Sequence, residues 1–175
     1  MKKAMLILPA MLLAACATMN TDMATAPGAL PASDIAGIVT TANEGEIAQG
    51  QAASSAATSS DVRAFAQMMV SDHTAALSAA RDTFSRNNIT PGENDTTQTL
   101  RANSQRTISN LATYKGAAFD RTYMQSQVDL HQWLLTSLDT ALIPSARGEL
   151  LTLLQTQPAA VAAHLDRARQ IRSGL

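Results

Sequence analysis

The sequence that decides the fold is residues 62–84, VRAFAQMMVSDHTAALSAARDTF. Apolar side chains recur in it at intervals of three and four residues, which is the repeat of one face of an α-helix. That face consists of Val62, Phe65, Ala66, Met69, Ala76, Leu77, Ala80 and Phe84. Ser60 can cap the start, and Asn87-Asn88 followed by Pro91-Gly92 is typical of a helix end. The stretch therefore predicts one long amphipathic helix.

Four further segments show the same helical repeat, and no segment shows the alternation of a β-strand. They cover residues 33–58, residues 96–114, a segment from residue 117 that ends before Pro144, and residues 145–171, within which Pro158 restarts the helix. An aromatic content of 3% in an alanine-rich chain favours close packing of helices over sheets. We predict an all-α, up-and-down helical bundle.

The N-terminus has the layout of a secretory signal. Lys2 and Lys3 precede an apolar run that closes with the sequence LAAC, residues 13–16. The run is shorter than the ~20 residues that cross a bilayer as a helix. We predict a signal peptide over residues 1–15, a flexible tether over residues 16–32 and one helical domain over residues 33–173.

Cys16 is the only cysteine, and two interpretations of it are open. One is an ordinary cleaved signal with an incidental cysteine. The other is a lipid anchor, because residues 13–16 resemble the lipobox of bacterial lipoproteins, whose cysteine is acylated. That resemblance, with Ala17 as the next residue, implies attachment to the outer membrane of a Gram-negative cell, facing the periplasm. The expected partners are the membrane, through Cys16, and an envelope protein. A formal net charge of −1 without a basic patch argues against nucleic acid.

Four polar residues lie on apolar helix faces. A helix advances about 100° per residue, so Glu46, eleven positions after Ile35, faces the core as Ile35 does. The same arithmetic turns His73, His131 and His164 inward, each on a different predicted helix. One carboxylate and all three histidines of the chain therefore point into the bundle.

Two interpretations of this inward cluster are open. A buried carboxylate needs a partner because an isolated buried charge is costly, so the cluster could be a hydrogen-bonded network that fixes helix register. A carboxylate with two or three histidines is also a suitable ligand set for one divalent transition metal, such as zinc, copper, nickel or iron. The candidate metal ligands are Glu46, His73, His131 and His164.

Five pieces of the chain, in order, resemble a large bacterial family of predicted outer-membrane or periplasmic proteins. The domain of this family is of unknown function and is classed as ferritin-like. The pieces are residues 43–48 (NEGEIA), 62–73 (VRAFAQMMVSDH), 116–123 (GAAFDRTY), 127–131 (QVDLH), and Pro158 with His164-Leu165. The resemblance spans about residues 33–172. It implies a ferritin-like four-helix bundle with an additional helix in the crossover.

The sequence departs from the pattern of di-iron proteins with this fold. Those proteins use a Glu from each of two helices and a Glu-x-x-His pair from each of the other two. Here the residues three positions before the histidines are Val70, Val128 and Val161. We therefore expect no di-iron centre, whereas a mononuclear, histidine-rich site fits the residues.

No serine nucleophile elbow and no glycine-rich phosphate loop is present in the sequence, so it indicates no catalytic residue. We expect a lipid-anchored helical module of the cell envelope that acts by protein interaction or envelope maintenance rather than by catalysis. The alternative is a periplasmic protein that binds one metal ion through the inward Glu/His cluster.

Overall fold

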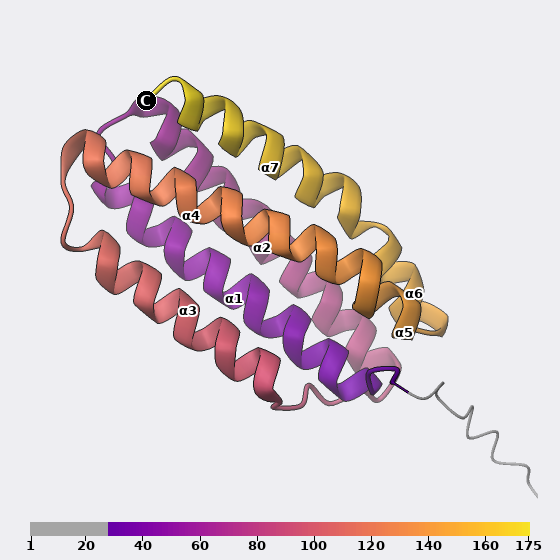
Figure 1. The fold of residues 1–175 in the computed structure, drawn as a ribbon. Helices are drawn as coiled ribbons and strands as arrows, with labels where there is room; N and C mark the ends of the chain where they lie inside the picture. Colours follow the sequence, from indigo (N-terminus) through magenta and orange to yellow (C-terminus); the bar gives the residue numbers. More distant parts are fainter. Residues whose placement is uncertain (1–27) are drawn as a thin grey trace, which may run out of the picture.

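The computed structural model describes residues 28–175, and this part of the chain is all-helical, without a strand (Figure 1). The all-α prediction is confirmed. The predicted signal peptide, Cys16 and the first part of the predicted tether lie outside the described residues. Among the described helices, none combines the length and the apolar character that crossing a membrane requires.

Five long helices account for most of the described chain: α1 (Ala32–Ala56), α2 (Ser60–Arg86), α3 (Asp95–Leu111), α4 (Gly116–Ser137) and α7 (Gln157–Ser173). The π-helical turn η1 (Leu138–Leu142) and the short helices α5 (Ile143–Ser145) and α6 (Gly148–Gln155) lead from α4 to α7. Helix α1 packs along α2, and α4 packs along α7. Helix α3, which connects α2 to α4, lies alongside α1 (Figure 1). The described residues thus form a helical bundle in which α3 joins the α1–α2 pair to the α4–α7 pair.

The core consists of two hydrophobic clusters, one toward each end of the bundle. On each of four helices, a buried Glu or His separates the residues that join one cluster from those that join the other. These residues are Glu46 on α1, His73 on α2, His131 on α4 and His164 on α7. They therefore form a polar layer that crosses the bundle at one depth.

Asp120 closes the turn between α1 and α2. Its buried carboxylate accepts the backbone N–H groups of Thr58 (3.0 Å) and Ser59 (2.8 Å). The sequence predicts Ser60 as the cap of α2, but the N-cap is Ser59, and its side chain makes no capping hydrogen bond. The turn is satisfied instead by a carboxylate from α4, so Asp120 fixes the contact between α4 and the α1–α2 turn.

Helix α4 ends at Ser137, before Pro144 as predicted, but the helical path does not stop there. The chain continues from α4 through η1 into α5, which contains Pro144 near its start. Proline lacks an N–H, and its ring collides with the carbonyl four residues earlier in a regular helix. The wider π-helical turn relieves that collision, so the helical path continues past the proline.

Two segments outside the long helices pack closely on the bundle: the residues just before α1 and the connection between α2 and α3. A Cβ at Gly37 would lie 1.9 Å from the carbonyl oxygen of Gly92, and the Gly92 N–H donates to Ser33 O at 2.8 Å. Glycine at position 37 is what lets the α2–α3 connection cross α1 at this distance. Leu30, which belongs to the predicted tether, packs against the core, and its N–H donates to Ser145 Oγ at 3.0 Å.

Candidate metal centre

The structure brings the four predicted site residues into the same polar layer. The side chains of Glu46 and His131 are fully buried, and His73 and His164 are each 7% exposed. They come from four different helices, so the site exists only in the folded bundle. The inward direction predicted for each of them is confirmed.

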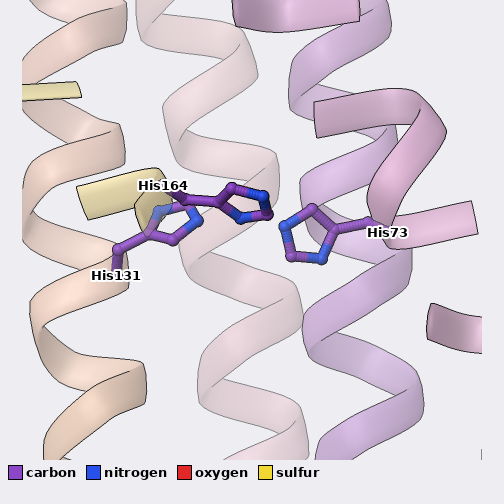
Figure 2. Close-up of side chains that lie close together, drawn as sticks. All are labelled: His73, His131 and His164. Carbon is purple, nitrogen blue, oxygen red and sulfur yellow. The ribbon is translucent and has the colours of Figure 1, made fainter. Parts of the chain in front are cut away.

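The three imidazole rings converge on one point between α2, α4 and α7 (Figure 2). Their ring centroids are separated by 5.9 Å (His73 to His131), 5.5 Å (His73 to His164) and 5.4 Å (His131 to His164). One nitrogen of each ring lies within 4.8 Å of a nitrogen of both others. The rings meet edge to face or at a tilt rather than in parallel stacks, with one nitrogen of each near the other two rings.

Each ring is held from behind by an oxygen. His73 Nδ1 lies 2.9 Å from Asn43 Oδ1, His131 Nδ1 lies 2.9 Å from the Gln127 carbonyl oxygen, and His164 Nε2 lies 3.1 Å from Asp72 Oδ2. Amide, carbonyl and carboxylate oxygens only accept hydrogen bonds, so in each contact the ring nitrogen carries the hydrogen. The Asn43 amide is itself oriented, because its Nδ2 donates to Val39 O at 2.8 Å.

The opposite nitrogen of each ring is therefore a bare lone pair. These nitrogens are His73 Nε2, His131 Nε2 and His164 Nδ1, and each is buried without a hydrogen-bond partner among the described residues. A metal-binding histidine shows this arrangement: its second nitrogen donates to a carbonyl or carboxylate, which fixes the tautomer and aims the free lone pair.

Burial keeps the three rings neutral. Desolvation, together with the charges that the other two rings carry when protonated, lowers the pKa of His73 to about 3. Desolvation also lowers the pKa of His131 to about 4, against the opposing effect of its bond to the Gln127 carbonyl. The pKa of His164 is lowered by burial despite its contact with Asp72. At neutral pH all three lone pairs are thus available to a cation.

Glu46 lies beside the three histidines and not within the ligand set. Its Oε2 accepts a hydrogen bond from Gln127 Nε2 at 3.0 Å, and its Oε1 lies 3.7 Å from His131 Nδ1, the ring edge remote from the free lone pair. The group of side chains whose ligand atoms lie within 4.8 Å of one another contains only the three histidines among the described residues. Complete burial raises the pKa of Glu46 to about 7, although the Gln127 bond lowers it.

Four other residues shape the site, and the sequence did not single them out for it. Tyr123 has a buried hydroxyl without a partner among the described residues, and burial together with the nearby Glu46 raises its pKa. Asn43, Asp72 and Gln127 orient the rings. Gln127 lies four residues before His131 on the same helix face, so helix spacing could have identified it. Asp72 comes from α2 and contacts α7, a pairing that only the packing of helices determines.

The geometry suits a compact ion after a small closure. Nitrogens bound to zinc at 2.0–2.1 Å in a tetrahedral site lie roughly 3.4 Å from one another. One nitrogen of each histidine lies within 4.8 Å of the other two, so these nitrogens need to approach by up to about 1.4 Å, which changes in side-chain torsion angles can supply.

Comparison with known sequences identifies the family. The chain belongs to the family described as "Domain of unknown function (DUF4142)", whose profile matches residues 17–171. The match includes α1 to α4 and all four residues of the polar layer, and it confirms the prediction of a domain family of unknown function. No curated protein and no solved structure matches the chain.

Proposed function

We propose that this domain binds one divalent transition-metal ion through His73 Nε2, His131 Nε2 and His164 Nδ1. The observation that carries the proposal is the set of three buried lone pairs that face one another, each on a ring whose other nitrogen is held by an oxygen. A metal ion satisfies all three at once.

A purely structural cluster does not satisfy these nitrogens. Each buried acceptor without a donor costs about 1–3 kcal/mol. A single water molecule has two hydrogens, so it donates to two of the three rings at most. If one ring carried its hydrogen on the nitrogen that faces its neighbours, its other nitrogen would be an acceptor. That nitrogen would then face the oxygen that now accepts its hydrogen bond, so two acceptors would meet. Protonation of a ring is disfavoured because burial lowers the pKa of all three.

The ligand chemistry defines the class of metal. Three neutral imidazoles suit zinc, copper, nickel or iron(II), whereas magnesium and calcium prefer oxygen ligands. Three protein ligands leave a fourth position for a water molecule or a small ligand. The ion's charge is offset by Glu46, next to His131, and by Asp72, behind His164. We therefore assign Glu46 a charge-compensating role beside the three ligands.

The wider setting of the site is also part of the proposal. The order of the long helices, with α3 as a crossover between the α1–α2 and α4–α7 pairs, supports a ferritin-like bundle. The sequence at residues 13–16 supports a lipid anchor at Cys16, with the domain held at the outer membrane and facing the periplasm. A role in protein interaction at the envelope is compatible with metal binding, but the histidine geometry favours metal binding as the molecular activity.

The test is a metal measurement on the chain purified without a histidine tag. The protein is stripped with a chelator, reloaded with zinc or copper, and freed of excess metal before elemental analysis. We expect about one ion per chain in the wild type and nearly none in His131→Gln, which cannot present the Nε2 lone pair. Tyr123→Phe is the matched control, because it changes a buried polar group of the same layer without removing a ligand. Absence of tight metal in the wild type, or equal metal in His131→Gln, would contradict the proposal.

A further inference from the structure

A hollow of about 600 Å³ lies between α3 and α4, on the side of α4 away from the histidine cluster. Residues of α1 form its floor, and residues of α3 and α4 form its walls. Ser126, Asp129 and Trp133 line it from α4, and His131 is not part of the lining. The volume falls within the range of about 300–1,000 Å³ that is usual for small-molecule sites.

The hollow exists because α3 packs along α1 and makes few contacts with α4. Its floor is held in place by a short polar bridge: Ser104 Oγ donates to the Gly45 carbonyl at 3.3 Å, and Gln49 Nε2 donates to Ser104 Oγ at 3.4 Å. A Cβ at Gly45 would lie 3.2 Å from Ser104 Oγ, so glycine permits this close approach. The groove is a fixed feature of how the crossover helix is attached.

Most of the residues that line the hollow carry hydroxyl, amide or charged groups, although apolar atoms supply the larger share of its surface. Threonines and Asn103 line the α3 wall, and Gln49 and Thr41 lie in the floor. The charged side chains are Arg106, Asp95 and Asp129, so neither sign dominates. Large apolar contact comes mainly from Leu100, Leu130 and Trp133.

Trp133 gives the groove an aromatic surface. It is 38% exposed, and it is one of two large hydrophobic side chains exposed in the described part of the chain. It lies one helix turn after Asp129, so the indole ring and the carboxylate are neighbours on the same face of α4. An aromatic plane beside a carboxylate and surrounded by hydroxyls matches a ligand with an apolar C–H face and many hydroxyl groups.

We propose that this groove binds a neutral oligosaccharide, with one sugar ring stacked on Trp133 and its hydroxyls bonded to Asp129, Asn103 and the threonines of α3. Leu100, Leu130 and Trp133 are the large apolar side chains of the lining, too few to match the row of anchors that an amphipathic helix docks with. In the hollow around Trp133, one arginine stands against two aspartates, which argues against an anionic group bound at this part of the groove.

The ligand is longer than one sugar. A second hollow, lined by Arg121, Gln125 and Arg172 among others, shares Ser126 and Asp129 with the first. The two therefore form one groove along α4, which suits a linear chain of several sugar units. This proposal is independent of the metal site.

Trp133 is the only tryptophan, so its fluorescence reports directly on this groove. The purified chain is titrated with a β-linked N-acetylglucosamine tetramer and, in parallel, with a β-linked glucose tetramer, up to about 10 mM so that millimolar affinities are detected. We expect a saturable change in fluorescence with at least one of the two sugars. Which one binds more tightly identifies the type of saccharide.

Calorimetry then compares variants that do not depend on fluorescence. Trp133→Ala and Asp129→Asn are expected to weaken binding about tenfold or more. Tyr114→Ala, which removes an exposed aromatic side chain that does not line the groove, should leave binding unchanged. Circular dichroism and bound metal should be the same in all three variants. Lack of saturable binding of either sugar, or equal binding by Trp133→Ala, would overturn the proposal.

Discussion

Without metal, the His131→Leu variant should be more stable than the wild type. With metal present, the variant should be less stable than the wild type. His131 Nε2 has no hydrogen-bond donor among the described residues, and a buried acceptor left without a donor in the metal-free wild type costs about 1–3 kcal/mol. Leucine removes that cost. The Gln127 carbonyl that His131 contacts keeps its ordinary helical hydrogen bond within α4, so no new unpaired group is created.

The shape mismatch between imidazole and leucine offsets part of the gain, by up to about 1.5 kcal/mol. The expected net stabilisation of the metal-free variant is therefore about 1 kcal/mol. With metal at about 1,000 times its dissociation constant, the wild type gains about 4 kcal/mol and the variant does not. The order of stabilities should reverse between the two conditions.

The assay is urea unfolding followed by far-ultraviolet circular dichroism, with a chelator and with excess zinc, at about pH 6. At that pH the carboxyl of Glu46, with its pKa raised to about 7, is mostly neutral in the folded protein. Tyr123→Phe is the control, since it also deletes a buried group without a partner but should shift stability equally in both conditions. The reasoning is refuted if His131→Leu destabilises the metal-free protein by more than about 2 kcal/mol, a loss expected of a well-satisfied core residue.

Three further predictions concern pH, helix capping and ligand orientation. Between about pH 6.5 and pH 4, histidines in the unfolded chain bind protons that the folded ones, with their lowered pKa values, do not, and Glu46, with its raised pKa, offsets part of this difference. The free energy of unfolding of the metal-free protein, measured by urea unfolding, should therefore fall by of order 2 kcal/mol for each unit that the pH is lowered near pH 5. A free energy of unfolding that does not change with pH in this range would contradict the burial of the rings. Asp120→Ala should cost about 2–3 kcal/mol because it leaves two N–H groups of the α1–α2 turn without their acceptor, and a loss below about 0.5 kcal/mol in the same assay would show that the turn does not depend on it. Asp72→Asn should weaken zinc affinity about tenfold in a competitive chelator titration, since the carboxylate orients His164, whereas Asp61→Asn, on the same helix but away from the site, should have no effect.

The sequence predicts much of this structure because helix periodicity is a local property. The repeat in residues 62–84 gives both the length of α2 and the inward direction of His73, and the same arithmetic places Glu46, His131 and His164. Their common depth was not predicted from the sequence, because it depends on how the helices are aligned in the bundle, and the structure places each of them between residues of the two core clusters.

What the sequence could not give depends on how the helices pack. Helix phase shows that Glu46 points inward, but side-chain torsion angles place its carboxylate on the Nδ1 side of His131. Asp72 is partly exposed at the edge of the core, and its contact with His164 needs α2 and α7 side by side. The sequence did not predict that the helical path continues through Pro144, because a π-helical turn has no sequence repeat of its own.

X-ray absorption spectroscopy of the zinc-loaded chain tests the central claim most directly. The account predicts three imidazole nitrogens at about 2.0–2.1 Å, with the outer-shell scattering that imidazole rings produce, and a fourth light ligand. In His131→Gln this imidazole signature should fall or the metal should be lost. A zinc environment dominated by carboxylate or water oxygens, with no more than one imidazole, would contradict a centre built from His73, His131 and His164.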